Sequence, residues 1–324
     1  MNLNLQRKYF LIILLFLTTT CIPPVHDKPD DPRTFDKPEI NLLDLGSSLP
    51  YFNDFIYAMH KTHLSDILVE KGPYTVFIPN QWAFSKFRTE NQINHTDQVP
   101  EETMTDILLY HIIKGRWTIS KIAAGYHSTL ALEKTTGNPI VLFIEKDGLF
   151  RLNGIPAMDE PDLETRNGII HSITSVIELP TILDHLSFNK EFSMILNILN
   201  SKDLQPDFLN LLSQDGPYTF WAPTNQAILS FVENNQDWQT IYDIPIETLI
   251  NILKYHLVSG ENMVLKVITG NKKLTSINGS ILTIQADYKK WSVSDLNGRI
   301  ANITENDIQC SNGVIHQIDR VLLP

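Results

Sequence analysis

The sequence predicts an α+β protein that consists of two tandem copies of one domain. Several boxes of residues return after a nearly constant interval, which is the signature of a duplication. Segments early in each copy carry apolar residues at helical spacing, whereas later segments are short apolar runs separated by Asn-Gly and Asp-Gly turns. Helices and strands that are segregated along the chain favour an α+β domain over a doubly wound sheet.

The repeated boxes define the two copies. GPYTVFIPNQWAF begins at Gly72 and returns as GPYTFWAPTNQAI at Gly216. LLYHIIKG returns as LKYHLVSG, and NGIIHSITSVIELP returns as NGVIHQIDRVLLP, each 145 residues later. We therefore expect one domain over residues 41–180 and a second over residues 181–324, each near the usual size of a single domain.

The elements of each copy follow in the same order. Each copy is expected to open with a helical stretch, over residues 51–69 and 191–212, in which apolar residues recur at helical intervals. The Gly-Pro-Tyr-Thr box predicts a turn and a short buried strand that ends at a proline. A second helix is predicted over PEETMTDILLYHII and PIETLINILKYHLV, because proline and glutamate are favoured at helix N-termini. The remaining apolar runs predict hairpin strands.

The first residues resemble a signal peptide, because a basic pair precedes an apolar run that is too short to cross a bilayer. Cys21, at the end of this segment, resembles the acylated cysteine of a bacterial lipoprotein. We expect a signal peptide over residues 1–20 and a lipid-anchored spacer, rich in proline and charge, over residues 21–40. Simple secretion with an incidental cysteine is the alternative.

The composition excludes several classes of function. The formal net charge is −11, and there is no basic stripe to bind a phosphate backbone, so nucleic acid is not an expected partner. If Cys21 is lipidated, Cys310 has no cysteine left to pair with. The sequence contains no nucleophile elbow, zinc-protease motif, calcium loop or phosphate-binding glycine loop. We therefore expect no enzyme activity, no cofactor and no metal site.

The repeated boxes resemble the signatures of the fasciclin-like domain. Residues 75–84 and 219–228 are similar to its motif Thr-hydrophobic-Phe-Ala-Pro-Thr-Asn-x-Ala-Phe. Residues 167–180 and 312–324 are similar to its closing motif Asn-Gly-hydrophobic-hydrophobic-His-x-Ile-Asp-x-Val-Leu-x-Pro, and a Tyr-His pair lies between the two motifs. The resemblance spans both copies. It implies that each domain is a wedge-like β-sandwich with helices packed on it, used in extracellular adhesion.

The Tyr-His pairs, Tyr110-His111 and Tyr255-His256, have two interpretations. In both copies the histidine falls on the apolar stripe of the second predicted helix, which predicts a buried and hydrogen-bonded side chain. The resemblance implies the other interpretation, because this region is linked to integrin binding in animal members of the family. We favour burial and keep the four residues as candidate partner contacts.

Each closing box also contains a histidine, His171 in the first copy and His316 in the second. On a strand these histidines share a face with aliphatic residues, so burial is again the expectation. The Asn-Gly pair before them predicts a turn with a left-handed residue.

The acidic segments just before the closing boxes are the strongest candidates for partner binding. Asp162-Leu163 and Asp307-Ile308 resemble the Asp-Ile segment that is implicated in integrin recognition in animal members of the family. An acidic residue in an exposed turn, beside an apolar anchor, can bind a basic patch or a metal of a partner. The alternative is that the aspartate caps the turn while the leucine or isoleucine packs inward.

The combined expectation is a bacterial adhesion or interaction lipoprotein. Its lipid would hold it to a membrane, which we expect to be the outer membrane. The domains would face the periplasm or the cell exterior and bind a surface protein or a matrix partner. The rival hypothesis is a carbohydrate-binding accessory lipoprotein of a glycan-uptake system, in which an exposed Trp117 or Trp291 stacks on a sugar ring.

Overall fold

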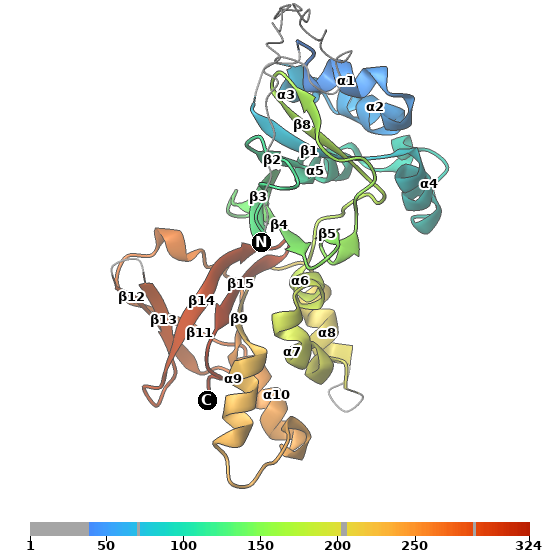
Figure 1. Cartoon of the computed structure of the whole chain (residues 1–324). Coiled ribbons are helices and arrows are strands. Elements are labelled where there is room, and N and C mark those ends of the chain that lie inside the picture. The colour runs from blue at the N-terminus through green and yellow to red at the C-terminus, as the bar shows by residue number, and fades with distance from the viewer. Residues whose placement is uncertain (1–38, 70–71, 202–205, 288–289) are drawn as a thin grey trace, which may run out of the picture. The chain divides into compact units, whose positions relative to one another are not determined.

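The computed structural model describes residues 39–69, 72–201, 206–287 and 290–324 (Figure 1). The expected signal peptide, Cys21 and most of the expected spacer lie outside the described residues, so these assignments stay predictions. Each copy of the repeat contains helices followed by strands, with one strand placed among the helices. The α+β fold class is confirmed.

Helices occupy the first part of the first copy, as the sequence predicts. The stretch expected to be helical over residues 51–69 is divided, because His63 between two helices has a φ of 57°. A helix that the sequence reading missed follows the first strand, where Asn80 accepts a hydrogen bond from the Ala83 N–H at 2.9 Å and caps the helix. The helices are α1 (Leu42–Ser48), η1 (Pro50–Phe52), α2 (Asn53–Lys61), α3 (Ser65–Val69), α4 (Gln81–Glu90), η2 (Thr96–Gln98) and α5 (Glu101–Tyr110).

The strands of the first copy form one sheet in the order β6-β5-β4-β3-β2-β1-β8-β7. Near one edge of this sheet lies a parallel pair, β1 and β8, in which Tyr74 lies opposite Gly168. The first and last repeated boxes of the copy are therefore neighbouring strands. The strands are β1 (Tyr74–Pro79), β2 (Ile112–Lys114), β3 (Gly125–Leu132), β4 (Pro139–Lys146), β5 (Phe150–Leu152), β6 (Ile155–Pro156), β7 (Leu163–Thr165) and β8 (Gly168–Ile173).

The second copy repeats this plan with a sheet in the order β10-β9-β15-β14-β13-β12-β11, which again contains one parallel pair near an edge, β9 and β15. One long strand, β14, takes the place of both β6 and β7. The helices are α6 (Ile182–Phe188), η3 (Lys190–Phe192), α7 (Ser193–Leu199), α8 (Pro206–Ser213), α9 (Asn225–Glu233), η4 (Ile241–Asp243), α10 (Ile246–Tyr255) and η5 (Leu265–Val267). The strands are β9 (Tyr218–Pro223), β10 (Leu257–Ser259), β11 (Lys272–Thr275), β12 (Ile281–Asp287), β13 (Lys290–Ser294), β14 (Ile300–Gln309) and β15 (Gly313–Ile318).

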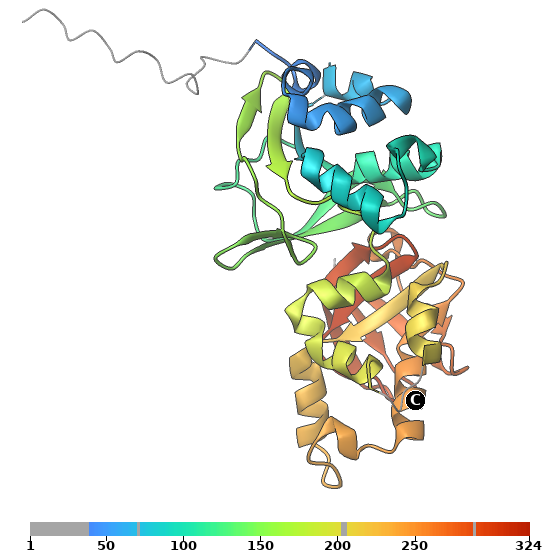
Figure 2. The same cartoon turned by 90° about the vertical axis from the view of Figure 1, so that its right-hand side faces the viewer.

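The strands of the first repeated box, β1 and β9, bury side chains on both faces. In β1, Val76 joins a core formed with the helices, while Phe77 points to the opposite face and joins a second core among the strands. In β9, Phe220 and Trp221 divide in the same way. Figure 2 shows the helices of each copy gathered on one side of its sheet. Burial on both faces explains why these strands are continuous apolar runs in the sequence.

The Asn-Gly pair of each closing box allows two strands to approach closely. A Cβ atom on Gly168 would lie 2.2 Å from the Tyr74 carbonyl oxygen, and one on Gly313 would lie 2.2 Å from the Tyr218 carbonyl oxygen. The expected left-handed residue is wrong for Gly168, whose φ is not positive, whereas Gly313 has a φ of 156°. In both copies there is no room for a Cβ atom against the neighbouring strand, and this is the physical reason for the glycine.

The asparagine of the same pair joins three segments. Asn167 Oδ1 accepts from the Leu42 N–H at 2.9 Å, and Nδ2 donates to a carbonyl at the end of α3 at 2.9 Å. Asn312 Oδ1 accepts from the Ile182 N–H at 2.9 Å, and Nδ2 donates to a carbonyl at the end of α8 at 2.8 Å. Each asparagine therefore fixes the first helix of its copy to the closing strand, a role that the sequence reading did not predict.

Candidate interaction site

The Tyr-His pairs lie in the interior of each copy, where α5 and α10 end. Tyr110 and Tyr255 are both 0% exposed. The Tyr110 hydroxyl donates to the Val141 carbonyl at 2.9 Å and accepts from Asn153 Nδ2 at 2.9 Å. The Tyr255 hydroxyl donates to the Ile281 carbonyl at 2.9 Å. Burial raises the pKa of both tyrosines, so both hydroxyls stay protonated at neutral pH.

The paired histidines are buried and neutral. His111 Nδ1–H donates to the Ile107 carbonyl at 2.7 Å, and Nε2 accepts from the Ile177 N–H at 3.0 Å. His256 makes the two corresponding bonds, at 2.8 Å and 3.0 Å. Burial lowers the pKa of each histidine to about 4. Each ring therefore connects the end of its helix to the chain that leaves the closing strand.

This geometry confirms the expectation that the Tyr-His pairs are core residues. Their polar atoms bond within the same copy, and a partner could touch Tyr110, His111, Tyr255 or His256 only after the domain opened. Their role as partner contacts stays a prediction, and the described structure gives them a folding role that is sufficient to explain the residue types.

The closing-box histidines hold the acidic turns in place. Nδ1 of His171 accepts from the Asp162 N–H at 3.1 Å, and Nε2–H donates to the Trp117 carbonyl at 2.9 Å. His316 makes the corresponding bonds with the Asp307 N–H at 3.1 Å and with a backbone carbonyl at 2.8 Å. Because Nδ1 receives an amide proton, both rings are neutral Nε2–H tautomers. Burial lowers the pKa of both, to about 4 for His316.

The two aspartates bond to the loop beside them. Asp162 and Asp307 have φ values of 58° and 55°, in the left-handed region that aspartate tolerates. Oδ1 of Asp162 accepts from the Ile119 N–H at 2.8 Å, and Oδ1 of Asp307 accepts from the Leu265 N–H at 2.7 Å. Each carboxylate thus fixes the loop that follows β2 or β10, instead of capping its own turn.

The two acidic turns differ in exposure. The side chain of Asp162 is 39% exposed, whereas that of Asp307 is 5% exposed and lies 3.8 Å from Lys266 Nζ. The expectation of an exposed turn is confirmed for Asp162 and wrong for Asp307, because β14 continues through the second position as a bulged strand. Leu163 is half-buried and Ile308 is buried, so both apolar residues pack inward.

The tryptophans of the rival hypothesis differ as well. Trp117 is 40% exposed, and its Nε1–H donates to the Lys114 carbonyl at 2.8 Å, which holds the ring over a turn. Trp291 is half-buried and packs on the strand-side core of the second copy. Trp82, on the first turn of α4, is 80% exposed and was not singled out in the sequence reading.

Within the described ranges, no group of three or more His, Cys, Asp or Glu side chains is arranged to hold a metal ion. None of the helices described is both long and apolar enough to cross a membrane.

Known proteins are similar to this chain in sequence and in fold. A model of the fasciclin domain matches residues 50–180 and residues 190–324. The chain belongs to the fasciclin domain family. The two matched ranges fall one in each copy, which confirms the tandem arrangement, and the outer boundaries at residues 41, 180 and 324 stay predictions.

Relatives of this fasciclin chain occur in animals and bacteria. Human periostin is 27% identical over 81% of this chain, which spans only 28% of periostin. A Synechocystis protein, sll1735, is 28% identical over 42% of this chain and 96% of its own length. A solved FAS1 domain pair from the insect cell adhesion molecule Fasciclin I aligns with a TM-score of 0.51 and 19% identity, over 85% of this chain and 97% of that one. This likeness confirms the fold of a fasciclin pair.

Proposed function

We propose that this fasciclin chain is an exported, lipid-anchored bacterial protein that mediates adhesion or interaction at a membrane surface. Cys21 carries the lipid, the residues up to 40 act as a spacer, and the two domains present their loops to a protein or matrix partner. The anchor lies in the outer membrane, with the domains facing the periplasm or the cell exterior. The exposed turn at Asp162 and Leu163 is the contact that we assign to this role.

Family membership carries the proposal. The matching family model describes a fasciclin domain and indicates no catalytic family, and a solved pair of the same fold belongs to an insect cell adhesion molecule. The chemistry of the described residues agrees with a binding role, because the four repeated-box histidines bond to backbone groups and are neutral. The exposed turn at Asp162 is part of a loop, and loops are the usual carriers of binding in rigid domains.

Attachment of the source bacterium to a matrix-coated surface tests the proposal. A strain that lacks this chain is expected to attach less, and the full chain supplied in trans is expected to restore attachment. A Cys21→Ser chain cannot be lipidated, so it should be released and should fail to restore attachment. Equal attachment with and without the chain, on matrix and on partner cells, would reject the adhesion role.

The Asp162→Asn substitution tests the assigned contact. Asparagine keeps the Oδ1 acceptor for the Ile119 N–H, which is bonded at 2.8 Å, but removes the charge that a basic partner would meet. We expect attachment to fall while the thermal midpoint changes little. Asp237→Asn, at an exposed position of the second domain, is the matched control. If both variants attach like the unmodified chain, the acidic turn is not the contact.

Glycan binding is the second candidate, because the exposed face of Trp117 can stack on a sugar ring. A titration of the full chain against a panel of soluble glycans separates the two candidates. Binding that Trp117→Ala abolishes supports a role in glycan uptake. Binding to no member of the panel, with attachment dependent on the chain, supports the protein or matrix partner.

A further inference from the structure

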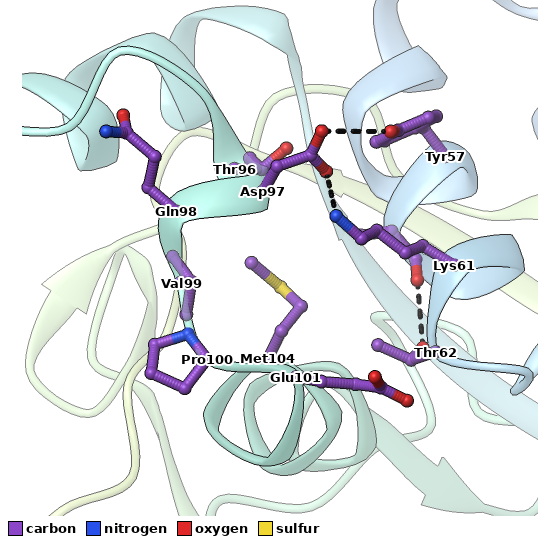
Figure 3. Close-up of a pocket in the computed structure, with 11 residues that line it drawn as sticks. Tyr57, Lys61, Thr62, Thr96, Asp97, Gln98, Val99, Pro100, Glu101 and Met104 are labelled. Atoms are coloured by element: carbon purple, nitrogen blue, oxygen red, sulfur yellow. Dashed lines mark hydrogen bonds and ion pairs between the residues drawn. The ribbon is translucent and has the colours of Figure 1, made fainter.

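A pocket of about 310 Å³ opens on the first fasciclin domain, between α2 and the segment that contains η2 and the start of α5 (Figure 3). It is formed by different residues from the acidic turn at Asp162. Its floor is apolar, since Ala58 and Met104 are 2% and 4% exposed and Val99 is half-buried. This volume is at the lower end of the range of ligand sites, and it suits one long side chain.

The rim of the pocket carries one carboxylate that forms neither a hydrogen bond nor an ion pair with another described residue. Asp97 accepts hydrogen bonds from Lys61 Nζ at 2.6 Å and from the Tyr57 hydroxyl at 3.1 Å, so both of its oxygens are engaged and the Lys61 charge is balanced. The hydrogen bond with Asp97 raises the pKa of Lys61. The Glu101 carboxylate, in the first turn of α5, is not bonded to any side chain in the described part of the chain, and its negative charge, like that of Asp97, also raises the pKa of Lys61.

The second domain builds the same helices without this pocket lining. η4 and α10 correspond to η2 and α5, and α7 corresponds to α2. Isoleucines replace the small and polar residues of the first domain: Ile198, Ile241 and Ile246 stand where the first domain has Ala58, Thr96 and Glu101. A cavity lined by Ile198 and Ile241 measures only about 20 Å³. The fold therefore does not require this lining, which is particular to the first domain.

We propose that this pocket binds a basic side chain of the partner protein, with arginine as the better fit. The aliphatic stem would lie on Ala58 and Met104, as the stems of basic residues do on apolar surfaces. The guanidinium would meet Glu101 and stack on the ring of Tyr57, which is 51% exposed. The net charge of −11 favours the approach of a basic partner. This inference rests on the proposed interaction role and assigns it a second contact.

The ε-methyl group of Met104 reports on the pocket directly. We would label the methionines of the full chain with ¹³C in the methyl group, in detergent, and assign Met104 with the Met104→Leu variant, since leucine stands at the corresponding position of the second domain. The probe is the blocked peptide acetyl-Gly-Arg-Gly-amide, and its citrulline analogue is an uncharged control of the same shape. We expect a saturable shift of the Met104 signal with the arginine peptide and little shift with the citrulline peptide.

Two substitutions are expected to change the binding in opposite directions, a third is the matched control, and a fourth should close the pocket. Glu101→Gln removes the carboxylate charge that the guanidinium would meet, and it is expected to weaken binding of the arginine peptide by about fivefold or more. Lys61→Gln frees the Asp97 carboxylate and is expected to strengthen binding by about threefold or more. Glu247→Gln, in the first turn of the corresponding helix of the second domain, is expected to change nothing. Ala58→Ile should close the pocket and abolish binding. If this variant fails to fold, Glu101→Gln and Lys61→Gln still test the assignment, because both substitutions lie at exposed positions.

The outcomes separate the pocket from the proposed function. Equal shifts with arginine and citrulline, no shift with either, or binding that survives Glu101→Gln would overturn the pocket assignment. If the arginine peptide behaves as expected but removal of the chain leaves attachment unchanged, the pocket stands and the adhesion role fails. If attachment depends on the chain but the peptide does not bind, the adhesion role stands and the pocket assignment fails.

Discussion

Replacement of Asn312 by alanine tests the joint that closes the second domain. Asn312 is only 6% exposed. Its Oδ1 accepts a hydrogen bond from the Ile182 N–H at 2.9 Å, and its Nδ2 donates to the Leu212 and Gln214 carbonyls at 2.8 Å and 2.9 Å. Alanine leaves one buried donor and two acceptors without these partners. At ~1 kcal/mol net for each bond, the free energy of unfolding of the second domain should fall by about 3 kcal/mol.

Urea denaturation of the full chain measures this loss. With an m value of ~2 kcal/mol/M, the transition of the second domain should move by about 1.5 M, and that of the first domain should not move. Hydrogen exchange with mass spectrometry assigns each transition to its domain, which is needed because two domains are not one two-state unit. The exposed Asn210→Ala is the matched control. A shift below about 0.5 M at unchanged slope would refute the assignment of Asn312 as a joint.

Three further predictions follow from buried groups. The free energy of unfolding should fall as the pH drops from about 6.5 to 4, by about 3 kcal/mol for each of His111 and His256. Burial lowers the pKa of each folded histidine to about 4, so the unfolded chain binds protons more readily over this range. Urea midpoints that do not change between these pH values would contradict this. Tyr110→Phe removes a hydroxyl with two bonds of 2.9 Å and should cost ~2 kcal/mol in the same assay, whereas Tyr57→Phe, at a 51% exposed position, should cost well under ~1 kcal/mol. Gly168→Ala places a methyl group 2.2 Å from a carbonyl oxygen of β1, so its first domain should melt far earlier or fail to fold, and an unchanged melting temperature would count against the close approach.

The duplication made the domain number and several elements of the fold predictable from the sequence. The repeated boxes fixed the number of domains, and the proline-stopped run after Gly-Pro-Tyr-Thr was correctly predicted as the strand that became β1 and β9. What could not be predicted was the pairing of that strand with the closing box, because parallel partners are brought together by chain topology over long separations. Helix α4 was missed because its start signal, Asn80, follows the strand with no intervening turn.

The candidate site was harder to predict than the fold. Periodicity correctly placed His111 and His256 in the core, but it could not reveal that His171 and His316 accept the amide protons of the acidic turns. The different exposure of the two aspartates depends on whether one strand continues or breaks, and of the segments Glu-Pro-Asp-Leu and Glu-Asn-Asp-Ile only the first carries a signal for the break. Proline is the physical signal, since it removes a ladder donor and disfavours a continuous strand at Pro161.

Two copies of one fold also provide an internal control that a single domain lacks. Side chains that are the same in both copies, such as Asn167 and Asn312, bond to the same elements and are explained by folding. The features that differ, an exposed acidic turn and an open pocket, both belong to the first domain, while the second domain has a buried aspartate and isoleucines at the matching places. A difference that folding does not demand is the better indicator of binding, because either version satisfies the core. On this reasoning we expect the proposed partner contacts on the first domain, so substitutions on its surface should alter attachment more than the matched substitutions on the second.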